Sequence, residues 1–340
     1  MSSINFLGDV WLPRPFVSEI PAEGPFVFNL ESPITSATTP AAVKVCLRAR
    51  RSYISQTFHR DPIAVCLANN HIMDYGPQGF ADTLAALGSA GISHFGAGEL
   101  SRNCGNPLLL EVSGTRLALL GYVSTVTHPI FATRTSPGVT PPVLETVDRD
   151  LKLARAKGAS LAIVHLHWGI EETHLPRPDD VELGRAIIHL GADAIIGHHA
   201  HCIQSTEIHQ RKPIYYGLGN CIFPDVHITG PGHTPEVSRK TQRNWNRRSL
   251  MATLDCQSSS FTQTELIFTG SELRAQTCAQ PLQPLACLAD PHYERRFRRH
   301  WRFCMFRLAL ARYLSEPRLP RAHHWRLLWR LLAPQTREAA

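Results

Sequence analysis

Apolar and polar positions along residues 1–270 form short apolar runs that alternate with longer amphipathic stretches. Three stretches have the length and period of helices, at 78–90, 144–157 and 180–190, and a glycine follows each of them. Apolar runs that predict strands come next, at 92–95, 161–166 and 194–196. Repeated units of helix, glycine and strand predict an α/β sheet protein.

Other apolar runs extend the predicted sheet at both ends of this region. Residues 4–8, 26–30 and 63–67 predict strands, and Pro77 is typical of a helix start after the last of them. Residues 224–247 are polar, with prolines and glycines, and predict a long loop. The runs 249–255 and 261–268 predict a pair of strands that closes the sheet.

After about residue 285 the pattern changes to two basic amphipathic stretches. Apolar residues recur at steps of three or four on each side of Pro317 and Pro320: Phe297, Trp301, Cys304, Leu308 and Ala311, then Trp325, Leu328, Trp329 and Leu332. We therefore predict a domain at 4–270 and a basic helical tail at 285–333. The apolar faces of the tail either pack on the body or contact a membrane surface, where arginine opposite tryptophan and leucine is typical.

The charge supports this division. The 340-residue chain has a formal charge of +7, but residues 291–333 hold eleven arginines and two acidic residues, so the rest of the chain is at −2. A basic tail on a slightly acidic body does not indicate a nucleic-acid binder.

Cysteine usage and the first residues bear on localisation. Nine scattered cysteines without a CxxC pair indicate neither a disulfide framework nor a cysteine zinc site. The first residues run directly into a predicted strand, and no stretch has the length of an apolar membrane span. We expect a cytoplasmic protein, or one held peripherally at the inner membrane by its tail.

Polar residues follow five predicted strands directly. They are Asp9; Glu31; Asn69, Asn70 and His71; His165 and His167; and His198, His199 and His201. The carboxyl ends of strands in an α/β fold open onto a common crevice, so we expect these side chains to converge. Asn, Asp and Gly are also ordinary turn formers, so the 68–80 stretch alone is equally compatible with a plain turn.

Oxygen and imidazole groups of this kind bind divalent transition metals. The predicted ligands are Asp9, Glu31, Asn70, His167, His199 and His201, which are enough for two adjacent ions of Mn, Fe or Zn. We expect the alternating spacing of His199 and His201 on extended backbone to place both rings on one face. Two such ions would lower the pKa of a water, leaving His71 to protonate a leaving group with Asp74 to orient it.

Five segments carry a family resemblance: GDVWL (8–12), NLESPIT (29–35), the 68–98 stretch that begins ANNHIMDYG, HWGIE (167–171), and the 191–220 stretch that begins GADAIIGHHAH. They resemble the capsule synthesis protein CapA family of poly-γ-glutamate capsule biosynthesis, within the calcineurin-like metallophosphoesterase superfamily. The resemblance implies a four-layer αββα sandwich with its site at the strand ends.

The resemblance also implies roles for particular residues. Asp9 and Glu31 resemble the first two acids of the family, and Glu171 is implied to face the substrate. We expect Asn69 and Asn220 to contact substrate too, and we assign His165 and His198 structural roles. Superfamily members usually carry a histidine where this chain has Trp11, which implies that one metal is weakly or differently bound.

Two functions from different classes are compatible with this pattern. The first is a metal-dependent hydrolase that cleaves a phosphoester or related bond in an anionic small molecule or polymer. The second is a non-catalytic metal- or polymer-binding component of a membrane-associated capsule assembly complex. A purely structural role for the histidines is disfavoured, because burying several unpaired ionisable groups is costly. No phosphate loop, GxSxG elbow or dinucleotide fingerprint is present.

Overall fold

The computed structural model describes residues 2–20, 24–41, 45–100, 104–227, 239–282, 284 and 286–315. The chain divides into two compact units, Met1–Leu288 and Ala289–Ala340, each described here by itself. The second predicted basic helix and part of the predicted 224–247 loop lie outside the described residues. The predicted domain limits, 4–270 and 285–333, remain predictions.

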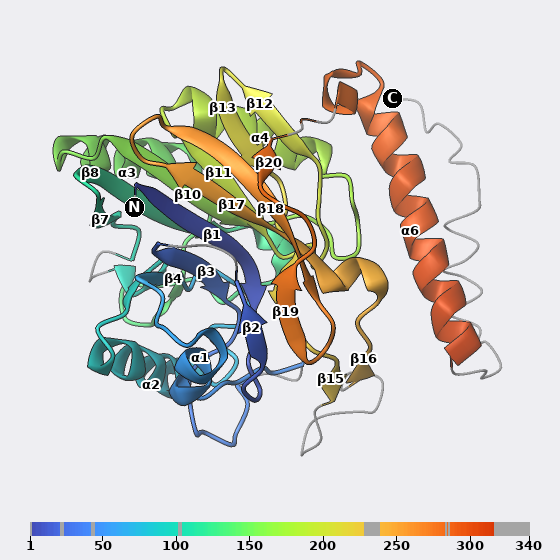
Figure 1. Ribbon diagram of the computed structural model, residues 1–340, viewed down its shortest axis with the longest axis horizontal. Coiled ribbons are helices and arrows are strands. Elements are labelled where there is room, and N and C mark those ends of the chain that lie inside the picture. The colour runs from blue at the N-terminus through green and yellow to red at the C-terminus, as the bar shows by residue number, and fades with distance from the viewer. Residues whose placement is uncertain are drawn as a thin grey trace. The chain divides into compact units, whose positions relative to one another are not determined.

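The first unit contains two large sheets (Figure 1). In the described residues the larger sheet has ten strands, in the order β2-β19-β18-β17-β1-β3-β4-β5, with β14 beside β1 and β20 beside β18. These strands are β1 (Ser3–Val10), β2 (Val17–Glu19), β3 (Phe26–Leu30), β4 (Ala64–Cys66), β5 (Ser93–Phe95), β14 (Asn220–Ile222), β17 (Arg248–Asp255), β18 (Ser260–Phe268), β19 (Glu272–Ala275) and β20 (Gln280–Pro281).

The smaller sheet has six strands among the described residues, in the order β12-β13-β11-β10-β8-β7. They are β7 (Leu108–Val112), β8 (Thr115–Val123), β10 (Leu161–His167), β11 (Ala194–His198), β12 (Thr206–His209) and β13 (Lys212–Tyr215). Two short ribbons pair β6 (Ala97–Gly98) with β9 (Gly138–Val139) and β15 (Val226–His227) with β16 (Arg239–Lys240).

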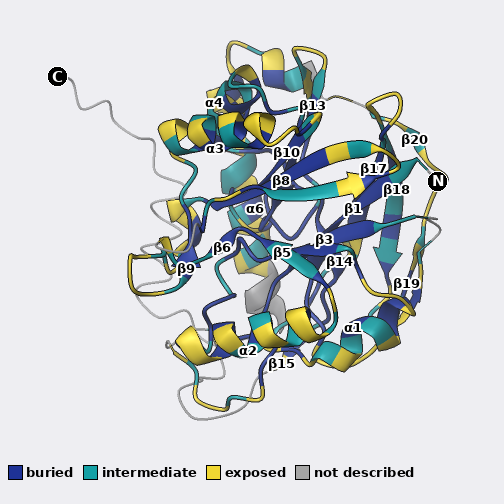
Figure 2. Cartoon of the chain, turned by 90° about the vertical axis from the view of Figure 1, so that its left-hand side faces the viewer, coloured by how far each residue is buried: buried dark blue, intermediate teal, exposed yellow. Residues whose placement is uncertain are grey.

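Helices cover the outer faces of both sheets. Figure 2 shows α1 (Arg51–Phe58) and α2 (Gly76–Ser89) on one side and α3 (Leu144–Ala156) and α4 (Pro178–His189) on the other, with the sheets between them. The four-layer αββα sandwich implied by the family resemblance is therefore confirmed. The other helical segments among the described residues are η2 (Thr125–Thr127), η3 (Asn244–Arg247), η4 (Ala286–Ala289) and, in the second unit, α6 (Tyr293–Ser315).

Among the described residues, the predicted helices and strands are confirmed with small shifts of their ends, whereas the described part of the predicted 224–247 loop contains the short elements β15, β16 and η3. The glycines that follow α2, α3 and α4 have positive φ angles of 68°, 86° and 112°, a conformation that ends a helix without a Cβ clash. The predicted strand pair forms β17 and β18, with β17 antiparallel to β1, but it does not close the larger sheet, because β19 and β2 continue beyond β18.

The core lies between the sheets and beneath the helices. Phe6 and Phe28 of the larger sheet and Leu119, Ile163 and Ile196 of the smaller one are fully buried in one cluster. Strands such as β10 are covered on both faces, which explains their nearly continuous apolar sequence. Among the described residues, no helix combines the length and the apolar character needed to cross a bilayer.

Candidate metal centre

The ends of strands from both sheets deliver side chains to one place. Asp9 lies near the end of β1, Glu31 directly after β3, and His167 at the end of β10. His199 and His201 follow β11. All five side chains are buried, with at most 6% exposed. The oxygen donors therefore come from the larger sheet and the imidazoles from the smaller one, so the packing of the two sheets assembles the site.

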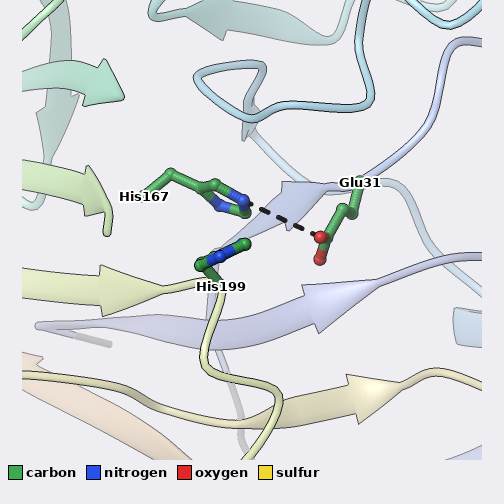
Figure 3. Close-up of side chains that lie close together, drawn as sticks. All are labelled: Glu31, His167 and His199. Atoms are coloured by element: carbon green, nitrogen blue, oxygen red, sulfur yellow. Dashed lines mark ion pairs between the residues drawn. The ribbon is translucent and has the colours of Figure 1, made fainter. Parts of the chain in front are cut away.

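Two groups of candidate ligand atoms share one carboxylate. Atoms of Glu31, His167 and His199 lie within 4.8 Å of one another, as do atoms of Asp9, Glu31 and His201. Figure 3 shows the side chains of the first group pointing toward one another. Glu31 belongs to both groups, which is the arrangement that a carboxylate bridging two ions requires.

Asn70 extends the first group to four residues. Its Oδ1 lies 2.9 Å from His167 Nε2, which in turn lies 3.8 Å from Glu31 Oε1. Two atoms that both lie about 2.1 Å from one ion are about 3 Å apart at an angle near 90° and about 3.8 Å apart at a wider angle, so these spacings are compatible with a common ion.

The bonding of these side chains fits a cation. Among the described residues, no hydrogen-bond partner reaches either carboxylate oxygen of Glu31 or Nδ1 of His199. Burial raises the pKa of the Glu31 carboxyl well above its usual range, and the charges of Asp9 and Glu171 raise it further. Buried polar atoms without partners are costly, and a divalent cation between them would remove that cost.

The imidazoles are in the form that ligates metals. Burial lowers the pKa of His199 to about 4, and that of His167 falls well below its usual value for the same reason. Burial also lowers the pKa of His201, and the charge of Lys240 adds to this effect. The three rings are therefore neutral at pH 7, with lone pairs for a metal ion.

Asp9 is held by three donors. Its Oδ1 accepts from Asn29 Nδ2 at 2.8 Å and lies 3.0 Å from His198 Nδ1, and its Oδ2 accepts from the His199 backbone N–H at 3.1 Å. Burial opposes the charged form, but the hydrogen bond and charge of His198 outweigh it and lower the pKa of Asp9. His165 Nδ1 lies 3.2 Å from His198 Nε2. His165 therefore orients the His198 ring, and His198 in turn orients the Asp9 carboxylate.

The expectation that His199 and His201 lie on extended backbone is wrong. Strand β11 ends at His198, and the φ angles of His199 and His201 are 86° and 54°. Left-handed conformations are uncommon outside glycine and occur at functional sites. This turn sends His199 toward Glu31 and His167, and His201 toward Asp9 and Glu31. The two-residue spacing indicates which histidines act together, but the local backbone conformation comes from the tertiary structure.

His71 and Asp74 form a pair beside the centre. His71 Nδ1 lies 2.7 Å from Asp74 Oδ2, and the His71 side chain is 13% exposed. The buried Asp74 carboxylate also accepts the Leu47 backbone N–H at 2.7 Å. The contact between His71 Nδ1 and Asp74 fixes the orientation of the His71 ring, and His71 Nε2 lies on the opposite edge of that ring.

Asn69 and Asn220 are each 1% exposed and bonded to site residues. Asn69 donates to Asn29 Oδ1 at 3.0 Å and accepts the His71 backbone N–H at 3.0 Å. Asn220 Oδ1 lies 2.8 Å from His201 Nδ1, which leaves His201 Nε2 toward Glu31, at 3.7 Å from Oε1. These contacts position neighbouring side chains, and the substrate contacts expected of both residues remain predictions.

Trp11 does not reach the centre with a polar atom. Its indole N–H donates to the Arg48 carbonyl at 3.1 Å, and its ring packs on Phe223 with centroids 5.5 Å apart. Among the described residues, the group around Asp9 therefore offers three protein ligands, whereas the group around His167 offers four.

Several residues near the centre are not predicted from the sequence. Glu172 accepts hydrogen bonds from Asn246 Nδ2 at 2.9 and 3.0 Å, and Asn246 also donates to the His201 carbonyl at 2.9 Å. Glu171 Oε2 lies 2.6 Å from Lys240 Nζ. Lys240 and Asn246 belong to a polar stretch without periodicity. Asn29 could have been predicted as a site residue from the sequence, because it is a polar residue inside a strand that is otherwise apolar and buried.

Together, the fold and site define an α/β sandwich protein with a candidate metal centre. Residues 6–225 match the family model described as bacterial capsule synthesis protein PGA_cap, and the chain belongs to this family.

Curated relatives agree with this assignment. Capsule biosynthesis protein CapA of Bacillus anthracis is 37% identical over 46% of this chain and 39% of its own length. A probable polyglutamine synthesis accessory protein of Mycobacterium tuberculosis is 35% identical over 58% of this chain and 54% of its own. PGA biosynthesis protein CapA of Bacillus subtilis is 30% identical over 57% of this chain and 52% of its own length. The chain spans about half the length of these relatives or less.

Solved structures show more distant likeness. A 5'-nucleotidase precursor from Thermus thermophilus matches 64% of this chain and 40% of its own, at 18% identity and a TM-score of 0.39. A hypothetical protein from the same organism matches 82% of this chain and all of its own, at 16% identity and a TM-score of 0.42. Scores this low carry no conclusion about function.

Proposed function

We propose that this chain is a metal-dependent hydrolase that cleaves a phosphoester or a related bond in the production of a capsule polymer. The observation that carries this proposal is Glu31, a fully buried carboxylate shared by two groups of candidate ligands. Relatives named for capsule and PGA biosynthesis support the link to a polymer. The substrate would be an anionic small molecule or polymer.

Two divalent cations, of Mn, Fe or Zn, would be held at the centre. Glu31, Asn70, His167 and His199 would bind one ion, and Asp9, Glu31 and His201 the other. When bound, such a pair supplies Lewis-acid activation of a water and of the substrate oxyanion.

The residues around the centre would orient the reaction and transfer a proton. Asp74 accepts a hydrogen bond from His71 Nδ1 and orients the imidazole, whose Nε2–H would be donated to a leaving-group oxygen. Asn29 and His198 fix the Asp9 carboxylate, so that its orientation does not depend on substrate.

A non-catalytic role is the second candidate. The Mycobacterium tuberculosis relative is named as an accessory protein, which supports a metal- or polymer-binding component of a capsule assembly complex. In this case the centre would bind metal and ligand without turnover.

The test compares hydrolysis of p-nitrophenyl phosphate and bis-p-nitrophenyl phosphate by the full chain loaded with Mn²⁺. We expect the His71→Asn variant to keep its metal and lose about 100-fold or more in kcat. The exposed His59, changed to Asn, serves as the control and should retain full activity. Metal-loaded wild-type protein that hydrolyses neither compound would favour the accessory role, and full activity in His71→Asn would refute the assigned proton donor.

A further inference from the structure

An ion pair at the edge of the candidate centre is not used by the proposed reaction. Lys240 Nζ, on β16, lies 2.6 Å from Glu171 Oε2 and 3.5 Å from Glu172 Oε1. Both glutamates belong to the loop that follows His167 at the end of β10. The lysine ammonium is thus held between two carboxylates that differ in their exposure to solvent.

The buried side of this arrangement fixes the ammonium close to the centre. Glu172 is 8% exposed, and its carboxylate accepts hydrogen bonds from Asn246 and from the Trp245 indole N–H. Asn246 also donates to the His201 carbonyl, so Lys240, Glu172, Asn246 and His201 form one continuous network. The charge of Lys240 reaches the centre, since it lowers the pKa of both Glu31 and His201.

The other side of the arrangement is open to solvent. The Glu171 side chain is 46% exposed and that of Lys240 is 33% exposed. Water reaches this side of the ion pair and weakens it by screening, so another carboxylate could compete with Glu171 for the ammonium. Glu172 would keep the ammonium in place.

We propose that Lys240 is an anion anchor that binds a carboxylate of the substrate by exchanging its exposed partner Glu171, while the reacting oxyanion lies at the metal centre. A carboxylate is the fitting ligand because a carboxylate is the group that Lys240 already binds. Substrates would then carry two anionic groups, one at each end of the segment held in the site. This inference rests on the proposed function, because the metal centre must bind the first group.

The test measures binding to the full chain loaded with Mn²⁺, with metal content determined for every sample. The probes are phosphonocarboxylates with one, two and three methylenes, each paired with an alkylphosphonate of equal length that lacks the carboxylate. Isothermal titration gives Kd for each pair. We expect at least one phosphonocarboxylate to bind about five- to tenfold more tightly than its match.

Three variants assign this preference to the anchor. Lys240→Met should abolish the preference, whereas Glu171→Gln should increase it by removing the competing charge. Lys152→Met is the matched control, because Lys152 forms an exposed 2.6 Å ion pair with Asp148 on α3. Circular dichroism and metal content confirm that each variant is folded and loaded.

The outcomes separate the two proposals. A carboxylate preference that persists in Lys240→Met, or wild-type protein that binds metal and alkylphosphonates without any preference, overturns the anchor alone. Wild-type protein that retains no metal and binds no phosphonate overturns the proposed function and the anchor together.

Discussion

Asp180 is a buried carboxyl whose environment disfavours its charge. It lies in the first turn of α4 with 3% exposed, and Arg177 is its nearest cation, 3.6 Å from Oδ1. Burial raises the pKa of Asp180 to about 7, although the charge of Arg177 lowers it, and the charge of Asp179 adds to the increase. The folded protein therefore binds a proton here at a pH where the unfolded chain has lost it.

This pKa predicts a pH-dependent contribution to stability. Because the pKa of Asp180 is higher in the folded protein than in the unfolded chain, the contribution of Asp180 to stability is fully present below about pH 4. This contribution is lost as the pH rises toward 7. We expect the free energy of unfolding of wild type relative to Asp180→Asn to fall by about 1.4 kcal/mol per pH unit between about pH 5 and 7. Urea unfolding at several pH values measures this difference, and parallel pH profiles for the two proteins would contradict the prediction.

Gly8 precedes Asp9 at a place where two backbones approach closely. A Cβ at this position would lie 1.9 Å from the Gly219 carbonyl oxygen, so β1 and the segment before β14 would have to separate. We expect Gly8→Ala to lower the free energy of unfolding by about 3 kcal/mol and to reduce metal content.

Gly88 on α2 provides the matched control. A Cβ there would meet no atom within 4 Å, so Gly88→Ala should be neutral or stabilise by up to about 1 kcal/mol. If urea unfolding gave the same change in the free energy of unfolding for Gly8→Ala and Gly88→Ala, the close backbone approach at Gly8 would not be what makes a Cβ costly there.

At the scale of elements, the sequence predicts strands and helices well because their apolar periods reflect burial. The polar residues at the ends of β1 and β10 and after β3, β4 and β11 could be grouped because the strands of an α/β fold open at one edge. The left-handed turn at His199 could not be predicted, because its φ angle of 86° is imposed by contacts with distant segments. Lys240 was missed for a related reason: a lysine in a polar stretch gives no signal until the fold brings it beside Glu171.

Helix α6 presents aromatic and aliphatic side chains to solvent on one face. Phe303, Phe306 and Leu310 are 57%, 44% and 44% exposed, at steps of three and four residues, and arginines accompany them along the helix. Such a combination favours contact with an anionic membrane surface. The remainder of the predicted tail, at 316–333, lies outside the described residues.

This exposed face predicts membrane binding by the full chain. We expect it to float with vesicles containing phosphatidylglycerol and to bind less as salt increases. A double variant, Phe303→Ser with Phe306→Ser, should reduce the bound fraction severalfold, whereas Ile208→Ser, which alters a 45% exposed residue of β12, should not. Equal flotation of both variants and wild type would refute a role for α6.

At the scale of the whole molecule, the candidate centre depends on both sheets. Asp9, Glu31 and Asn70 lie at or after the ends of strands of the larger sheet, whereas His167, His199 and His201 lie at or after the ends of strands of the smaller one. Glu31 joins the two ligand groups, so its loss should affect both ions, whereas the loss of one histidine should affect one.

The most direct test is the metal content of the full chain at equilibrium with Mn²⁺, measured by mass spectrometry after dialysis. We predict about two ions per chain for wild type and His59→Asn, about one for His199→Ala and for His201→Ala, and nearly none for Glu31→Gln. Circular dichroism should show that every variant remains folded. A folded Glu31→Gln variant with the wild-type metal content would contradict the shared carboxylate and the dinuclear centre built on it.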